Sequence, residues 1–566
     1  MRTARSTLAR ALVIAVFVGG FITPIAMGVW ETVLPAFGYF PPLGALKPGL
    51  AAWRALVGLP GFWTSVRLTI GVGVAATLIS LICAAAFCAF ACRRIGSGAP
   101  QRLLAWPLAT PHAALAIGLA FVIAPSGWIS RLLSPWIATG GIPPDIATVN
   151  DPWGMALILG LLLKEIPFLA FIILAALNQV PVAAQMRVAD SLGYTRDEAW
   201  LKVILPQLYP QIRLGVYIVL AFSLSVVDVA IILGPGNPPT LSVAAMRWFT
   251  AADIRLLMPA SAAAILQAII IVLAIVSWRL GEMAVARIGK HWVTRGRRNG
   301  AARPCLLLAG TVTVILAALG ALALSSLVLW SFAWEWRFPS FLPTRWSLQN
   351  WVLHAGTYGD ALWNTLSIGF CSTLASLLLA ILWLESGIDG RSAAFLNAAY
   401  LTLIFPQIGF LYGLNVAMLR TGIGSGWAAV TWAHVLFVLP YTIMTLKDSW
   451  HALDPRFART AATLGASPFR ILLAVKIPLL LRPLLAAAAV GFSVSVAQYL
   501  STLFIGGGRI PTLTTEAVAL SSGSDRRLVA ILAVLQAALP LLVFASALML
   551  PRMIEQRRNQ RFQAPR

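Results

Sequence analysis

The feature that most limits what this chain can fold into is a series of apolar runs, each long enough to cross a lipid bilayer. Hydrophobic residues make up 59% of its 566 residues and charged residues only 11%, a composition typical of polytopic membrane proteins. A bilayer core about 30 Å thick requires roughly 20 apolar residues per helix. Because every backbone polar group must be satisfied inside hydrocarbon, the runs should be helices. We therefore expect an all-α, polytopic membrane protein.

About twelve spanning helices can be assigned, six in each half of the chain. The runs lack the short alternating strands of a membrane β-barrel. The first run is longer than the apolar region of a signal peptide and more spans follow it, so we expect an uncleaved span there. The expected spans lie near 9–30, 66–91, 102–124, 153–177, 213–235, 258–280, 304–333, 362–384, 393–418, 427–447, 485–505 and 528–550.

The formal net charge of +23 raises the question of nucleic-acid binding. A nucleic-acid-binding protein gathers its basic residues on one domain or face, whereas here they are spread over the loops between apolar runs. Most of them lie in one alternating set of loops, which the positive-inside rule assigns to the cytoplasm. We therefore expect a lipid bilayer and no nucleic acid as partner, with both chain termini in the cytoplasm.

A twenty-residue stretch between two apolar runs occurs twice. It reads RVADSLGYTRDEAWLKVILP from Arg187 to Pro206 and RTAATLGASPFRILLAVKIP from Arg459 to Pro478. Farther along, FSLSVVDVAIIL (222–233) matches FSVSVAQYLSTL (492–503) without a gap. Just beyond, PTLS at 239–242 matches PTLT at 511–514. These matches, in the same order, indicate an internal duplication.

The duplication divides the chain into two halves of six spans each. Because six is an even number, both halves enter the membrane from the same side and form parallel repeats. We expect the first repeat at 1–285 with its loop at 182–206, a basic cytoplasmic linker at 286–303, and the second repeat at 304–566 with its loop at 454–478.

Each half also carries, in its third span, a proline followed by a glycine seven residues later. The pairs are Pro111 with Gly118 and Pro406 with Gly413. Proline kinks a helix, and glycine lets two membrane helices approach closely. We interpret both pairs as kinks and packing contacts rather than as ligand sites.

Within the repeated stretch, local chemistry predicts a helix, a break and a second helix. Gly193 and Gly465 follow helix-forming residues and suit the left-handed position after a helix. Each glycine precedes the closing proline, Pro206 or Pro478, by thirteen residues. We expect these prolines to end the second helix before the next span.

The start of the second helix is marked in both copies by different residues. Thr195, followed three residues later by Glu198, has the pattern of a capping box. Ser467 precedes Pro468, which suits an N-cap followed by proline at the first helical position. One such hairpin could simply connect two spans. Two copies at equivalent places favour docking to a two-fold symmetric partner.

The glycine-to-proline spacing between the fourth and fifth spans of each half resembles the EAA loop of ABC importer permeases. Two such loops in one chain are similar to the fused permeases of ferric-iron, thiamine, sulfate and spermidine importers. The resemblance implies a type I importer permease fold in a bacterial inner membrane, a homodimeric ATPase subunit and a periplasmic solute-binding protein. It also implies that the short helix after each glycine is a coupling helix, which sits in a groove of the ATPase and transmits ATP-driven closure.

The resemblance covers most of the chain, with one departure. The family has a glutamate six residues before the glycine, where this chain has arginine in both copies. Because both copies changed alike, we expect a matched change in the ATPase subunit. Carried over position by position, the ATPase-coupling loops comprise Arg187, Ala189, Gly193, Thr195, Glu198, Leu205 and Pro206 in the first copy, and Arg459, Ala461, Gly465, Ala466, Ser467, Ile477 and Pro478 in the second.

The pattern G-x-x-x-x-G-K-[ST] of a phosphate-binding loop does not occur. We therefore expect ATP to be used by the partner subunit and no cofactor to be bound by this chain. The histidines are scattered without metal-ligand spacing, and the cysteines lie in or beside apolar runs, where they pack. We predict neither catalytic residues nor a metal site, and expect that this chain is not itself an enzyme.

Ionisable and polar residues inside spans are costly and are functional candidates by default. Lys164 and Glu165 need separate partners because neighbours on a helix do not face each other, and we favour a structural ion pair with another helix. Polar residues of the fifth spans either line the translocation path or join helices by hydrogen bonds. The candidates for lining the path are Ser225, Asp228, Ser495 and Gln498.

Two other protein classes fit the sequence less well. A twelve-span secondary transporter of the major-facilitator kind would concentrate its motif between spans two and three, where this chain has only a short loop. A membrane-embedded enzyme would require paired catalytic groups. We therefore expect the transmembrane subunit of an ABC importer that moves a small solute.

Overall fold

The computed structural model describes the chain as almost wholly helical. The described residues are 2–91, 104, 106–136, 141–296, 302–387, 405–523 and 525–563. Among them, β1 (Ala333–Glu335) and β2 (Arg345–Trp346) form a small antiparallel pair. The prediction of an all-α, polytopic membrane protein is confirmed.

Ten described helices are long and apolar enough to cross a membrane, and a pair bent by 80° at Leu480 makes an eleventh. Each matches one expected span, from Arg10–Ala36 at the start to Arg526–Pro551 at the end. The remaining expected span, 393–418, overlaps a shorter apolar helix, Ile408–Arg420. Its first part lies outside the described residues.

The first half runs through seventeen helical elements in the described residues. They are α1 (Arg2–Phe17), η1 (Val18–Ile22), α2 (Thr23–Ala36), η2 (Pro41–Leu43), α3 (Ala51–Gly58), α4 (Phe62–Ala91), α6 (His112–Ile123), α7 (Trp128–Leu133), α8 (Met155–Leu177), α9 (Val182–Ser191), α10 (Arg196–Ala199), η4 (Trp200–Ile204), α11 (Leu205–Ser225), α12 (Asp228–Leu233), α13 (Leu241–Phe249), η5 (Ile254–Leu256) and α14 (Leu257–Thr294).

The second half repeats this order. Besides β1 and β2, its elements are α15 (Ala302–Phe332), α16 (Gln349–Leu353), α17 (Ala355–Ser386), α19 (Ile408–Arg420), α20 (Trp427–His451), α21 (Pro455–Thr463), α22 (Pro468–Ile471), η6 (Leu472–Lys476), α23 (Ile477–Leu479), α24 (Leu481–Val496), α25 (Leu500–Gly506), α26 (Leu513–Leu520) and α27 (Arg526–Gln563).

The first span of each half packs against the third span of the other half. Helix α2 lies on α19, and α15 lies on α6. At the first crossing, a Cβ on Gly413 would collide with the carbonyl oxygen of Gly28. At the second, a Cβ on Gly118 would collide with the carbonyl oxygen of Ala323. The packing role predicted for Gly118 and Gly413 is confirmed.

The matched PTLS and PTLT segments make the same hydrogen bonds in both halves. Ser242 Oγ donates to the carbonyl oxygen of Val226 (2.9 Å), at the break after α11. Thr514 Oγ1 donates likewise to Val496 O, after α24. Each segment thus ties a short helix to the end of its fifth span.

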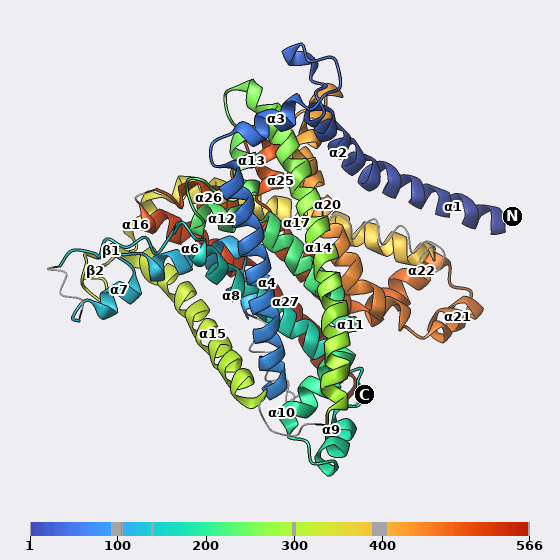
Figure 1. Ribbon diagram of the computed structural model, residues 1–566. Helices are drawn as coiled ribbons and strands as arrows, with labels where there is room; N and C mark the ends of the chain where they lie inside the picture. The colour runs from blue at the N-terminus through green and yellow to red at the C-terminus, as the bar shows by residue number, and fades with distance from the viewer. Residues whose placement is uncertain are drawn as a thin grey trace.

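Figure 1 shows both labelled termini and the helices of the repeated loops, α9, α10, α21 and α22, towards the lower and right side of the molecule. Helices α3, α7 and α16 and the β1–β2 pair lie towards the upper and left side. The two loop copies therefore share an end of the molecule with the termini, as parallel repeats require.

Candidate functional site

The break in each repeated loop is built around a left-handed glycine. Gly193 has φ +79° and Gly465 has φ +81°. In the residue after each glycine, the backbone N–H bonds back to the preceding helix: Tyr194 N donates to Ala189 O and Ala466 N donates to Ala461 O, both at 3.0 Å. This is the hydrogen bond of a Schellman motif, which closes a helix C-terminus. The predicted backbone geometry of both glycines is confirmed.

The helix after each glycine begins at the residue expected to cap it. Thr195 Oγ1 accepts a hydrogen bond from Glu198 N (3.4 Å). Ser467 Oγ accepts one from Arg470 N (3.3 Å), with Pro468 at the first helical position. Thr195 and Ser467 therefore do the same job with different side chains.

The closing prolines do not end the second helix, so that prediction is wrong. A π-helical turn, η4 in the first copy and η6 in the second, directly precedes each Leu/Ile-Pro pair, and the helix continues past Pro206 and Pro478. Proline lacks the N–H that an α-helix needs at that position. A π turn, with its wider i→i+5 bonding, already disturbs the α-helical ladder there.

Beyond the prolines the two copies differ. The chain is two residues shorter between Pro478 and Phe492 than between Pro206 and Phe222. In the first half α11 runs without a break to Ser225. In the second half the helix bends by 80° at Leu480.

Both loops present large apolar side chains to solvent. Leu192 and its counterpart Leu464 are exposed, Leu464 by 83%, and Phe469 on α22 is 69% exposed. Outside a bilayer, gathered apolar side chains mark a surface for a partner. The first copy is anchored by the buried Trp200, whereas among the described residues of α21, α22, η6 and α23 none is buried.

The arginines that replace the family glutamate are exposed on the helices before the glycines. Arg187 lies on α9 and Arg459 lies on α21. Within the described part of the chain, neither is joined to a carboxylate. Both guanidinium groups are therefore available to a partner.

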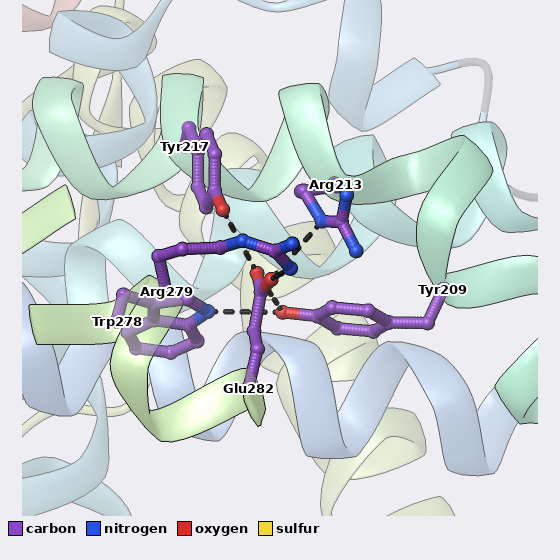
Figure 2. Close-up of polar contacts among 6 residues, drawn as sticks. All are labelled: Tyr209, Arg213, Tyr217, Trp278, Arg279 and Glu282. Atoms are coloured by element: carbon purple, nitrogen blue, oxygen red, sulfur yellow. Dashed lines mark hydrogen bonds and ion pairs between the residues drawn. The ribbon is translucent and has the colours of Figure 1, made fainter. Parts of the chain in front are cut away.

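A buried carboxylate below the first loop joins α11 to α14 (Figure 2). Glu282, whose side chain is 6% exposed, accepts hydrogen bonds from Tyr209 Oη (2.9 Å) and Tyr217 Oη (3.1 Å). Its other oxygen lies 3.0 Å from Arg213 Nε and 2.7 Å from Arg279 Nη1. Sequence reasoning missed this cluster. The sequence feature that could have indicated it is Glu282 itself, because acidic residues are rare in this chain and this one lies just beyond an expected span.

The polar residues of the second half's fifth span are buried among other polar side chains. Ser495 Oγ lies 2.8 Å from His434 Nδ1 and 3.0 Å from Ser372 Oγ. Gln498 Oε1 accepts a hydrogen bond from Ser501 Oγ (3.0 Å). These contacts join α24 to α17 and α20. Their lining of a translocation path stays a prediction.

The counterparts in the first half stand at the break between α11 and α12. Ser225 Oγ donates to Ala221 O, one turn earlier (2.7 Å). Asp228 is the first residue of α12. A role for Ser225 and Asp228 in the path stays a prediction.

Lys164 and Glu165 have separate partners on the third span, as expected. Lys164 Nζ donates to three backbone carbonyls, those of Pro107, Leu108 and Thr110, at 2.5–2.9 Å. Glu165 Oε1 lies 3.7 Å from His112 Nε2. The ion pair expected for Lys164 is wrong, although its role is structural. Its ammonium group caps the helix end before Pro111, where backbone carbonyls lack intrahelical partners.

No group of three or more metal-ligating side chains comes together in the described residues. No family model matches the chain. It is 35% identical over 448 residues to the inner membrane ABC transporter permease protein YnjC of Escherichia coli, covering 78% of this chain and 79% of that protein.

Two further relatives are each 28% identical. The putative 2-aminoethylphosphonate transport system permease protein PhnV of Salmonella typhimurium matches over 216 residues, 36% of this chain and 78% of its own length. The molybdenum transport system permease protein ModB of Haemophilus influenzae matches over 156 residues, 25% of this chain and 68% of its own length.

Proposed function

The chain belongs to the family of ABC transporter permeases, and from this premise we propose that it is the fused permease of an importer, whose halves move against each other to pass a small solute inward across the inner membrane. The observation that carries the proposal is the repeated loop. The same left-handed glycine, cap and π turn occur twice on one end of the molecule.

The unequal coverage of the relatives supports the fused arrangement. PhnV is covered over 78% of its length by little more than a third of this chain. One half of this chain therefore corresponds to a whole permease of that kind. This supports a division of the chain into two permease-sized halves, for which 1–285, 286–303 and 304–566 stay the predicted boundaries.

We assign α10 and α22 to the role of coupling helices on a homodimeric ATPase. A two-fold partner needs two similar surfaces, and both loops offer a capped helix with an exposed leucine before the glycine. ATP would be used by that partner. The termini, on the same end as the loops, would then be cytoplasmic, in agreement with the basic residues of those segments.

Selection of the solute is assigned to a periplasmic binding protein. The relatives' names mention 2-aminoethylphosphonate, molybdenum and spermidine/putrescine, which are chemically unlike one another. One permease plan therefore serves many solutes. The alternative of a twelve-span secondary transporter has no support among these relatives, which are named as ABC transporter or transport-system permeases.

The test is co-purification with a Walker-motif ATPase, which we expect to be encoded in a neighbouring reading frame. Reversing both exposed arginines, Arg187→Glu with Arg459→Glu, should weaken ATPase capture by about tenfold or more, since a charge-assisted contact contributes about 1.5–3 kcal/mol. Arg287→Glu, an exposed arginine on α14, is the matched control.

Undiminished capture by the double variant would remove the arginines from the interface. Failure of the wild-type chain to capture any ATPase would remove the importer proposal itself.

A further inference from the structure

A cavity of about 490 Å³ is lined by residues of β1 and α7. Figure 1 shows these two elements at the end of the molecule opposite the repeated loops. The cavity sits where α6 and α15 end and α27 begins, three spans that meet at one membrane surface. Its lining combines cationic and aromatic side chains: Arg131, Trp330, Trp334, Trp336, Arg526 and Arg527.

Two of the three arginines carry charges that no carboxylate among the described residues balances. Arg527 is paired with Asp525 at 3.2 Å. Arg131 is buried and donates to backbone carbonyls, including those of Arg337 (2.9 Å) and Ser340 (2.7 Å). These contacts fix its position but leave its positive charge unbalanced.

Arg526 is the group free to bind. Its guanidinium lies over the rings of Trp330 (5.4 Å) and Phe121 (5.7 Å). Within the described residues it makes no ion pair. Of the two carboxylates in the lining, Asp525 pairs with Arg527, and Glu335 pairs with Arg337 at 2.9 Å. Stacking orients Arg526 while leaving its N–H groups to a ligand.

The place that the internal repeat makes equivalent to this cavity is nearly filled. Between α2 and α19 the cavity measures about 10 Å³, and Arg420 there is neutralised by Glu31 at 2.8 Å. The sixth span begins in the same way in both halves. Asp253 accepts a hydrogen bond from Arg255 N before α14, and Asp525 accepts one from Arg527 N at the start of α27. The residue between them is Ile254 in one half and Arg526 in the other, so the repeat supplies the central arginine at only one of the two equivalent places.

The surroundings of the cavity are those of a membrane–water interface. Four large apolar side chains on α7, the segment after it, the β1–β2 turn and β2 are at least half exposed. Tryptophans gather here, as they do at the level of lipid headgroups. A ligand at this depth has an anionic head and an apolar tail. The exposed side chains are Leu132, Trp136, Phe341 and Trp346.

We propose that this cavity binds the phosphate group of a phospholipid headgroup. Arginine presents a planar fork that matches phosphate oxygens. Arg526 forms that contact, the buried Arg131 adds positive charge to the cavity, and the tryptophans contact the glycerol region. The volume is in the range of sites for a small ligand. A bound lipid would tie β1 and α7 to the first turn of α27.

The test uses the full-length permease, delipidated in detergent and followed by native mass spectrometry. It is titrated with dihexanoyl-phosphatidylglycerol, with inorganic phosphate and with dihexanoylglycerol. We expect one phosphatidylglycerol to bind with clear preference over the other two. Arg526→Gln should lower that affinity by about tenfold or more, whereas Arg255→Gln, at the equivalent helix start, should leave it unchanged.

Size-exclusion profiles identify the variants that are folded. A second variant, Arg526→Lys, keeps the positive charge without the planar fork, and we expect it to bind phosphatidylglycerol with intermediate affinity. Equal affinity in wild type and Arg526→Gln would overturn the proposal. Equal binding of dihexanoylglycerol would make the site a purely apolar one. Equal binding of inorganic phosphate would make it a site for a free anion instead of a lipid.

Discussion

Glu282 concentrates four polar contacts on one nearly buried carboxylate, and it shows how much a single side chain can hold together in this fold. It joins α11, which continues directly from the first repeated loop, to α14. A movement of the loop is therefore passed to two spans instead of one. Sequence patterns do not reveal this, because the partners of Glu282 are identified only by folding.

At this scale, Glu282→Gln should destabilise the protein. The change removes the charge that balances Arg213 and weakens the bond from Tyr209. Leaving such partners poorly satisfied costs about 1–3 kcal/mol. The measurement is thermal unfolding in detergent. Glu335→Gln, which breaks a more exposed ion pair with Arg337, should cost little, and an equal loss in both variants would contradict the assigned role.

At the scale of elements, the crossing of α2 over α19 depends on two glycines that let the backbones touch. A Cβ added at Gly413 meets the backbone of Gly28 and the hydroxyl of Thr32. Overpacking of this kind costs about 1–3 kcal/mol. Gly71, on α4, has open space around it, and alanine in a helix is otherwise better than glycine by roughly 0.5–1 kcal/mol.

The two substitutions are therefore expected to change the stability of the protein in opposite directions. Gly413→Ala should lower the unfolding temperature, and Gly71→Ala should leave it unchanged or raise it. Thermal unfolding of the two variants beside the wild type provides the check. A neutral Gly413→Ala would mean that the crossing is looser than the structure has it.

Elements differ in how far sequence could predict them. The spans follow from hydrophobicity, which each segment carries by itself, and the turn at Gly193 follows from local backbone preference. The helix through Pro206 was missed because a π turn depends on how successive hydrogen bonds are shared, which residue preferences do not express. The crossing partner of Gly413, in the other half, was also out of reach, as were the contacts of Ser495 with His434.

At the scale of the whole molecule, the two loops are alike in backbone and unlike in anchorage. The first is held by the buried Trp200 and by packing of α10 against α15, from the other half. The second has no buried residue among the described residues of α21 and α22. Segments with few buried contacts open most readily.

Limited trypsin digestion of the isolated permease in detergent should therefore cut the second loop before the first. Both loops offer exposed arginines, Arg456, Arg459 and Arg470 in the second against Arg187 and Arg196 in the first. Fragment masses identify the order of cleavage. Bound ATPase should protect both loops. Earlier cleavage at Arg187 or Arg196 would contradict the difference in anchorage.

The exchanged first spans have a consequence for synthesis. Helix α2 is inserted early, yet its partner α19 emerges from the ribosome almost four hundred residues later, since Gly28 meets Gly413. At a translation rate of roughly 5–20 residues per second, α2 waits about 20–80 s. During that time it must persist in lipid without α19, kept in the bilayer by its own hydrophobicity and by packing on α14 of its own half once that helix is made. Assembly of the first half is therefore completed only after the third span of the second half, α19, has been translated.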